Sequence, residues 1–461
     1  MKLQFDPRLI RKYNGPGPRY TSYPTAPHFR DGFGPADRAP LVEAGNGDPI
    51  PRPLSIYLHL PFCSSPCFYC ACHRVITRDS RKAEAYLRRL KREIGLQARD
   101  VDADRAVRQV HLGGGTPNFY SVDQLADLLD TIARHFRFAA PGAREVAIEL
   151  DPRRVAPGDL ARLAGEGFNR ASFGLQDLND DVQRAVNRVQ GSDECLALIE
   201  EARGQGFGSI NVDLMYGLPR QTPGRFAETV EKVITARPDR IALYGYAHMP
   251  DRFRPQVHIH DGELPSPEER LRIFCEAVEQ LTDAGYEYIG MDHFALPEDS
   301  LARARRMGTL IRNFQGYSTG DNTDILGMGV TAISQYGTGY AQNTTDLLTY
   351  YNRIDNDQLA VERGLFLTPE DHLRAELIQA IMCRGHVDIA DVEERHHIRF
   401  RSHFAAELGD LEHLEADGLV TIDEKSIRVT ETGRLLLRPV AMVFDAWLRR
   451  ESEGRRYSRI I

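Results

Sequence analysis

Between residues 55 and 250, six short apolar segments alternate with stretches of helical periodicity. The apolar segments are SIYLHL (55–60), QVHLGG (109–114), EVAIEL (145–150), RASFGLQ (170–176), SINVDLMYGLP (209–219) and RIALYGYAHMP (240–250). Continuous apolarity of this kind is typical of parallel strands that are covered on both faces. The repeated pattern therefore predicts an α/β fold, as an open sheet or as a complete or partial (β/α) barrel.

The stretches between these segments carry helix signals. The apolar residues of 82–97 fall on one helical face, and Ser121 with Gln124 forms a capping box before an amphipathic segment at 122–136. YEYIGMDHFAL, at 286–296, predicts one further strand. By contrast, the Gly-rich residues 300–345 are expected to be irregular.

The two ends of the chain differ in texture from this central region. Residues 1 to about 50 contain YNGPGPRYTSYPT, which predicts an extended arm without packed elements. After Thr368, helical patterns surround GLVTIDEKSIRVT, which predicts two strands joined by a turn. Helices combined with such a β-wing resemble a winged-helix module. We therefore expect an extended N-terminal arm at 1–53, a catalytic (β/α) barrel with an accessory region at 54–365, and a smaller, mainly helical, winged-helix-like domain at 366–461.

Charge and hydrophobicity restrict the partners. The 461 residues carry a net charge of -8, and residues 368–461 contain 18 acidic against 14 basic side chains. A DNA-binding role for the C-terminal domain is therefore disfavoured, and we expect a lid or docking role and no nucleic-acid partner. The start of the chain, MKLQFDPRLIRKYN, predicts no signal peptide, and no stretch approaches ~20 consecutive apolar residues. We expect a cytoplasmic monomer with no membrane partner.

Four of the seven cysteines, Cys63, Cys67, Cys70 and Cys72, follow the first apolar segment within ten residues. The odd cysteine count and the expected compartment disfavour a disulfide framework. A zinc site is disfavoured because no second Cys or His pair with ligand spacing follows. Iron–sulfur clusters are held by cysteine thiolates within one compact loop, which fits this arrangement. The other three cysteines, Cys195, Cys275 and Cys383, lie in helix-like segments and are expected to be buried thiols.

The spacing C-x3-C-x2-C directly after a first barrel strand resembles the radical S-adenosylmethionine (SAM) enzymes. In that superfamily three cysteines bind a [4Fe–4S] cluster, and SAM chelates the iron that has no cysteine ligand. An electron passed to SAM then yields a 5′-deoxyadenosyl radical. The resemblance implies that Cys63, Cys67 and Cys70 are the cluster ligands. It gives Cys72 no role, and this residue is equally compatible with a buried thiol and with a functional one.

A longer series of motifs runs through nearly the whole chain. The motifs are, in order, GPRYTSYPT, YLHLPFCSSPCFYCACH, HLGGGTPNFY, IELDPR, SFGLQDLNDDVQRAVNR, NVDLMYGLPRQTP, YAHMP, YIGMDHFALP, RNFQGYSTG and LGMGVTAIS. This series is similar to that of the oxygen-independent coproporphyrinogen III oxidases. The resemblance implies a radical SAM partial barrel. It also implies oxidative decarboxylation of two propionates of coproporphyrinogen III to vinyl groups. The products are protoporphyrinogen IX and CO₂, made without oxygen in haem biosynthesis. The sequence identifies neither the electron donor nor the acceptor.

The same resemblance implies two bound SAM molecules, one on the cluster and one beside it. Contacts with the first are implied for Tyr57, Gly114, Glu149 and Ile333. Contacts with the second are implied for Tyr69, Gly115, Thr116, Gln176, Arg188, Asp213 and Ala247. The residues themselves leave alternatives open. The glycines would also suit a tight turn, Glu149 could form a structural ion pair, and Arg188 could lie on an exposed helix face. The substrate carries four carboxylates, for which Arg19 and Arg312 are candidate partners.

Two other functions compete with this one. The first is a related haem-binding or haem-trafficking radical SAM protein. Such relatives lack the RYTSYP arm and the cysteine two residues after the third ligand, and this chain has both features. The second is a radical SAM methyltransferase, which would release S-adenosylhomocysteine.

Overall fold

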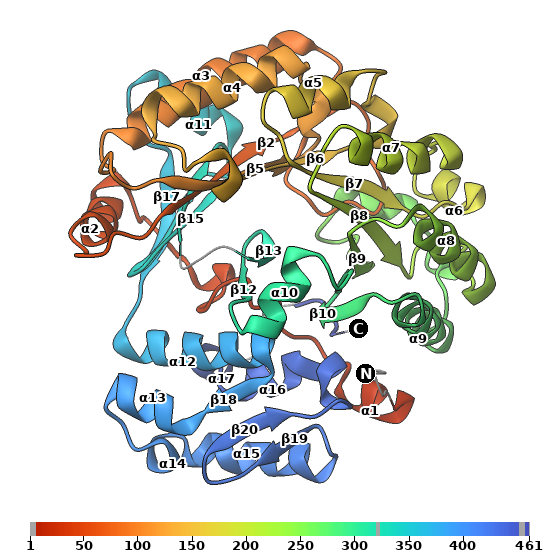
Figure 1. The fold of residues 1–461 in the computed structure, drawn as a ribbon, viewed down its shortest axis with the longest axis vertical. Coiled ribbons are helices and arrows are strands. Elements are labelled where there is room, and N and C mark those ends of the chain that lie inside the picture. The colour runs from red at the N-terminus through yellow and green to blue at the C-terminus, as the bar shows by residue number, and fades with distance from the viewer. Residues whose placement is uncertain (1–5, 320–322, 451–456, 461) are drawn as a thin grey trace.

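A 13-stranded sheet forms the centre of the computed structural model, which describes residues 6–319, 323–450 and 457–460 (Figure 1). The strand order is β1-β17-β16-β15-β14-β2-β5-β6-β7-β8-β9-β11-β10, and the seven neighbours from β14 to β9 are parallel. Six of these seven are the predicted apolar segments, which confirms the repeated β/α pattern. With β1 and β10 at its two edges, the sheet curves into a partial barrel.

The strands of this sheet are β1 (Arg30–Asp31), β2 (Leu54–Leu60), β5 (Val107–Gly114), β6 (Glu145–Leu150), β7 (Arg170–Gln176), β8 (Ser209–Tyr216), β9 (Arg240–Gly245), β10 (Glu287–Gly290), β11 (His293–Ala295), β14 (Asp324–Met328), β15 (Ile333–Tyr336), β16 (Gly339–Asn343) and β17 (Val361–Phe366). In β2, six of seven residues are buried, as expected for a strand covered on both faces. Because the strands from β14 to β9 are parallel, their carboxyl ends meet along one edge. The loops that follow them therefore lie side by side.

Helices cover the outer face of the barrel and appear in Figure 1 as an arc around the strands. They are α3 (Ser80–Ala98), α4 (Val122–His135), α5 (Asp159–Gly165), α6 (Asp180–Ala185), α7 (Ser192–Gly204), α8 (Pro223–Ala236), α9 (Pro267–Asp283) and α11 (Leu347–Asp355). The predicted capping box is present, since the Ser121 side chain accepts from the Gln124 amide and begins α4. No helix within the described part of the chain is both long and apolar enough to cross a bilayer.

The prediction that residues 300–345 are irregular was wrong. This region contains α10 (Ser300–Met307), the hairpin β12 (Ile311–Asn313) and β13 (Gly316–Ser318), and three strands of the main sheet, β14 to β16. Its glycines reflect close packing. A Cβ at Gly327 would overlap the backbone of Ile333, and one at Gly329 would overlap the Tyr86 hydroxyl. The single strand expected at 286–296 is instead the hairpin β10–β11.

The extended N-terminal arm was predicted correctly only in part. Residues 14–25 run without a helix, but α1 (Pro7–Tyr13) and α2 (Pro35–Asn46) were missed. Helix α2 forms despite an internal proline because Leu41 and Val42 are buried. Arg38 on the same helix is 1% exposed. Its guanidinium donates to Tyr336 on β15, to Gln97 on α3 and to Asp100 just after α3.

The C-terminal region packs below the barrel in Figure 1, with α10 and the β12–β13 hairpin between the two. Its helices are α12 (Pro369–Gln379), α13 (Ile389–His396), α14 (Phe400–His403), α15 (Ala405–Ala416), α16 (Leu437–Val443) and α17 (Ala446–Arg450). The two predicted strands are β19 (Val420–Ile422) and β20 (Ser426–Val429), paired antiparallel. A third strand, β18 (His386–Asp388), was not predicted because three residues are too few to show a period of two.

The N-terminal arm and the last described residues, 457–460, meet at Arg438 on α16. Its guanidinium donates to the carbonyls of Gly17 and Pro18 in the arm, and to those of Ser458, Arg459 and Ile460 in the tail. The two segments also bond directly to each other through backbone hydrogen bonds. One buried arginine therefore holds the N-terminal arm, at Gly17 and Pro18, and residues 458–460 against the C-terminal domain.

We predict that Arg438→Met lowers the free energy of unfolding by roughly 3 kcal/mol, because several buried carbonyls lose their charged donor. Urea unfolding followed by circular dichroism measures this difference. The matched control is Arg162→Met, which removes an exposed arginine paired with Asp123 on the barrel surface. It should change stability by less than about 0.5 kcal/mol. Equal stabilities of the two variants would contradict the role given to Arg438.

Candidate active site

The cysteine loop leaves the carboxyl end of β2 and is closed at its base by a short parallel pair, β3 (Phe62–Cys63) and β4 (Val75–Ile76). Backbone hydrogen bonds from Val75 to Pro61 and from Thr77 to Cys63 hold this base. The three predicted ligands, Cys63, Cys67 and Cys70, all lie on this loop, and Cys67 and Cys70 pack in one apolar cluster. Burial raises the pKa of the Cys63 thiol to about 11. Among the described residues, no three His, Cys, Asp or Glu side chains are already arranged around a metal position. Joint binding of a cluster by the three thiols stays a prediction.

Hydrogen-bond donors and cations surround two of these sulfurs. The Thr116 hydroxyl lies 3.2 Å from the Cys63 sulfur, and it comes from the loop after β5. Guanidinium nitrogens of Arg188 and Arg153 lie 3.5 and 3.9 Å from the Cys67 sulfur. Such donors can bond to the sulfur ligands of a cluster, whose iron is held by cysteine thiolates. The donor set therefore fits an iron–sulfur cluster.

The third sulfur has a thiol neighbour. The neighbouring Cys72 thiol, followed by the charge of Arg74, lowers the pKa of Cys70 to about 6. The nearness of Cys70 in turn raises the pKa of Cys72 well above its usual value, although the Cys72 side chain is exposed. The structure thus places Cys72, for which the sequence indicates no role, beside the third predicted ligand.

The GGGTP run lies directly against the start of the cysteine loop. The amides of Gly115 and Thr116 donate to the carbonyls of Leu60 and Phe62. A Cβ at Gly115 would lie 2.6 Å from the Pro61 carbonyl, and Gly114 has a φ of +114°. Close packing alone therefore requires glycine at these two positions. Contact of this run with SAM stays a prediction.

Tyr57 and Glu149 face the barrel interior and are connected by histidines. The Tyr57 hydroxyl lies 3.1 Å from His59, and the Tyr57 ring stacks on His111 at 5.8 Å. His111 bonds to Glu149 at 2.9 Å, and the Gly114 amide also donates to this carboxylate. Sequence reasoning missed both histidines, although each interrupts an otherwise apolar strand.

The Glu149 carboxylate is accessible from inside the barrel. Its side chain is 43% exposed, yet burial within the protein is the largest influence on its pKa. Burial would raise this pKa, but the hydrogen bond and charge of His111 keep it below the usual value. The ion-pair alternative therefore has a partner in His111, while part of the carboxylate stays open to a ligand.

Asp213 on β8 is the second interior carboxyl. It accepts from Ser172 at 3.2 Å and from Asn211 at 2.9 Å. Burial, followed by the negative charge of Glu149, raises the pKa of Asp213 to about 7. A carboxyl tuned in this way is typical of functional sites.

Arg188 is not the exposed helix residue that one interpretation suggested. It is buried behind the cysteine loop, where it donates to the Gly174 carbonyl at 2.6 Å and pairs with Asp151 at 3.5 Å. Gln176, at the end of β7, has a left-handed φ of 66° and a buried Oε1 without a partner among the described residues. An unpaired buried acceptor beside Arg188 is a feature that a bound ligand would satisfy.

Tyr69 and Ala247 are joined by Gln256. The Gln256 amide donates to the Tyr69 carbonyl at 3.1 Å and to the Ala247 carbonyl at 3.2 Å. Ile333 lies apart from the other predicted residues, because its side chain packs with the apolar cluster of Phe29. The Ile333 backbone occupies the space that a Cβ at Gly327 would fill, and Gly327 pairs with Tyr57 in the sheet.

The two arginines expected to bind substrate carboxylates lie side by side, because Arg312 donates to the Arg19 carbonyl. Of the three cysteines expected to be buried thiols, Cys195 and Cys383 are buried, but Cys275 is only half-buried.

A three-cysteine loop at the carboxyl edge of a partial β/α barrel is the arrangement of the radical SAM enzymes. The sequence model of the Radical SAM superfamily matches residues 57–233, and that of the HemN C-terminal domain matches 367–436. The oxygen-independent coproporphyrinogen III oxidases of Pseudomonas aeruginosa and Escherichia coli are 46% and 45% identical to this chain. Both alignments cover 100% of it and 99% of the relative. This chain belongs to the oxygen-independent coproporphyrinogen III oxidase family.

A solved structure agrees with this assignment. Coproporphyrinogen III oxidase from Escherichia coli, described as a radical SAM enzyme, superposes with a TM-score of 0.91 at 43% identity. The match covers 97% of this chain and 100% of the other. The family brings with it a [4Fe–4S] cluster and SAM as cofactors.

We predict that Cys67→Ser lowers bound iron and visible cluster absorbance at least tenfold after anaerobic reconstitution, because one of three thiolate ligands is lost. The matched control is Cys195→Ala, a buried thiol packed in the main core. This variant should keep wild-type iron content and absorbance. A full cluster in Cys67→Ser would refute its assignment as a ligand.

We predict a pH-dependent effect of Asp213→Asn on the protein without SAM. A carboxyl whose pKa rises from 3.8 to about 7 on folding stabilises the fold fully below pH 3.8. This stabilisation is lost as pH rises towards 7, by up to about 1.4 kcal/mol per pH unit. The variant should therefore gain stability relative to wild type between pH 4.5 and 7.5. Unfolding titrations at both pH values measure the gain, and parallel pH profiles would contradict the shifted pKa.

Proposed function

We propose that this chain decarboxylates two propionate side chains of coproporphyrinogen III oxidatively to vinyl groups. The products are protoporphyrinogen IX and CO₂, formed without oxygen in haem biosynthesis. One observation carries the proposal: the loop with Cys63, Cys67 and Cys70 follows the carboxyl end of β2, in a chain that aligns over its whole length with oxidases of this name. The alternative, a haem-binding relative, is disfavoured by the same full-length identity.

The cofactors would be held by residues already described. Cys63, Cys67 and Cys70 would ligate the [4Fe–4S] cluster, with Thr116 and Arg188 stabilising the charge on their sulfurs. When bound, the cluster and SAM supply one-electron cleavage of a C–S bond and a 5′-deoxyadenosyl radical. The cysteine loop and the GGGTP run, hydrogen-bonded to each other, hold the ligand set in place.

The SAM contacts are proposed residue by residue. Tyr57, Gly114, Glu149 and Ile333 would contact the first molecule. The open part of the Glu149 carboxylate supports its role, and Ile333 would act through its backbone. Tyr69, Gly115, Thr116, Gln176, Arg188, Asp213 and Ala247 would contact a second molecule. The buried Oε1 of Gln176 and the Asp213 carboxyl are the strongest support for that second site.

The chain itself would position the propionate and exclude water. Loss of a hydrogen atom from the propionate β-carbon, followed by loss of one electron to an acceptor, releases CO₂ and leaves the vinyl group. The barrel wall shields the reacting carbon from solvent and side reactions. The electron donor and acceptor are not identified. The domain limits 1–53, 54–365 and 366–461, the monomeric state and the cytoplasmic location stay predictions.

We predict that the reconstituted enzyme, given SAM, a reductant and coproporphyrinogen III without oxygen, forms divinyl product together with 5′-deoxyadenosine. Liquid chromatography quantifies both in one reaction. Formation of 5′-deoxyadenosine without a new tetrapyrrole would indicate radical SAM chemistry on another substrate. Formation of S-adenosylhomocysteine would indicate a methyltransferase. Tight haem binding with neither product would favour the haem-binding relative.

A further inference from the structure

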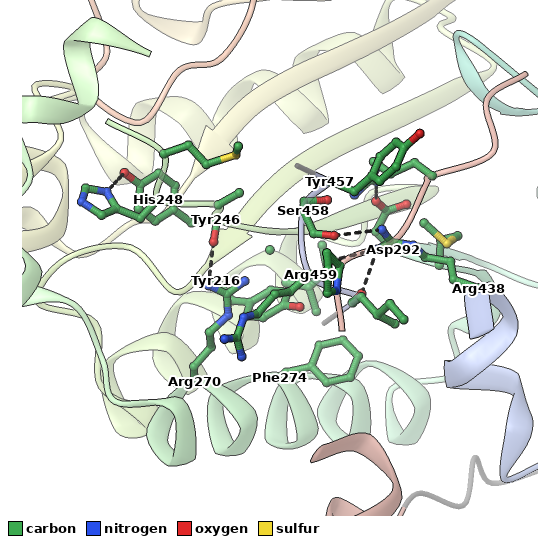
Figure 2. A pocket seen from close by; sticks show the side chains of 18 of the residues that line it. Tyr216, Tyr246, His248, Arg270, Phe274, Asp292, Arg438, Tyr457, Ser458 and Arg459 are labelled. Carbon is green, nitrogen blue, oxygen red and sulfur yellow. Dashed lines mark hydrogen bonds and ion pairs between the residues drawn. The ribbon is translucent and has the colours of Figure 1, made fainter. Parts of the chain in front are cut away.

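A cavity of about 960 Å³ lies where β8 and β9 end, enclosed by the barrel, the N-terminal arm and the C-terminal tail (Figure 2). Five arginines line it, Arg19, Arg252, Arg270, Arg438 and Arg459, against two carboxylates, Asp251 and Asp292. We call it the arginine cavity. In a chain whose net charge is -8, such a local excess of cations indicates an anionic ligand.

We propose that the arginine cavity binds carboxylates of the tetrapyrrole substrate, namely those propionates that are not reacting at the time. This inference rests on the proposed function and adds to it the place where the substrate is held. The volume lies within the range of about 300–1,000 Å³ that small-molecule sites occupy. Arginine suits the task because its planar fork binds carboxylate with two parallel hydrogen bonds.

Arg270 on α9 is the best-placed cation. Figure 2 shows its guanidinium between Tyr216 and the backbone of Tyr246. One nitrogen donates to the Tyr246 carbonyl at 2.6 Å, and the group lies 5.3 Å above the Tyr216 ring. Its Nε has no partner among residues 6–319, 323–450 and 457–460. The side chain is therefore held in one orientation with donors left over for a ligand.

The side of the cavity formed by the arm is also cationic overall. Asp292 pairs with Arg19 and lies 2.6 Å from His293. Burial would raise its pKa, but Arg19, His293 and Arg312 hold it far below its usual value. Burial, followed by the charge of Arg19, lowers the pKa of Arg438 to about 9. One carboxylate is thus surrounded by several cations, and a second anion would relieve their repulsion.

Arg252 stands at the rim, on the turn that follows β9. It is exposed, and its guanidinium lies over the ring of its neighbour Phe253 at 5.4 Å. The cavity also reaches the cofactor region, because Ala247 lines it and shares Gln256 with Tyr69 of the cysteine loop. A carboxylate bound here would therefore lie next to the proposed reaction site.

The test titrates the anaerobic holoenzyme with coproporphyrin III, a stable porphyrin with the same four propionates, and follows its fluorescence. We expect Arg270→Gln to raise the Kd roughly 10- to 100-fold, Arg252→Gln to raise it less, and Arg270→Lys to fall between wild type and Arg270→Gln. The control Arg162→Gln, on the barrel surface, should bind as wild type does. Coproporphyrin tetramethyl ester, which lacks the charges, should bind all four variants and the wild type equally.

Cluster absorbance and the unfolding midpoint check that each variant is folded. If Arg270→Gln does not fold, Arg252→Gln and the Arg270→Lys variant decide the outcome. Wild-type affinity for coproporphyrin III in folded Arg270 and Arg252 variants would overturn the proposal, and so would equal losses for the ester. Arginine-dependent binding without divinyl product would refute the reaction but keep the subsite. Divinyl product with unchanged affinities would support the reaction and refute the subsite.

Discussion

The parallel pairing of β2 with β5 is the constraint on which the rest of the site depends. Their register sets Tyr57 opposite His111 and Leu60 opposite Gly114. The cysteine loop and the GGGTP run therefore begin side by side at the carboxyl ends of the two strands. Backbone hydrogen bonds between the two runs then become possible only because glycine lets the chains approach. Thr116 reaches the Cys63 sulfur as a consequence. Further along the sheet, β6 and β8 deliver Glu149 and Asp213 to the same interior.

A second constraint closes the molecule around this interior. The arm and the tail meet on Arg438, and together they form one wall of the arginine cavity. Charges that would repel one another, on Arg19, Arg312 and Arg438, are held close by Asp292 and by backbone carbonyls. Fold stability and the electrostatics of the cavity thus share the same residues.

Prediction from the sequence succeeded where a signal was local and periodic. The six parallel strands, the capped start of α4 and the β19–β20 pair all carried such signals. It failed at α2, where an internal proline argues against a helix although burial of Leu41 stabilises one. It failed again at β14 to β16, where glycines required by close packing were taken for irregular chain. The histidines at 59 and 111 were visible in the sequence but had no assigned partner until the strands were paired.

The alternation of strands and helices and the three-cysteine spacing can be read from the sequence, because both depend on residues near one another in the chain. The motif series indicates the family for the same reason, since each motif is a short local run. The folded chain was needed to show that Arg188 is buried behind Cys67, that His111 bonds to Glu149, and that Arg19 lies beside Arg312. These contacts join residues tens to hundreds of positions apart. Their geometry follows from sheet register and from packing of the two termini, which no local pattern encodes.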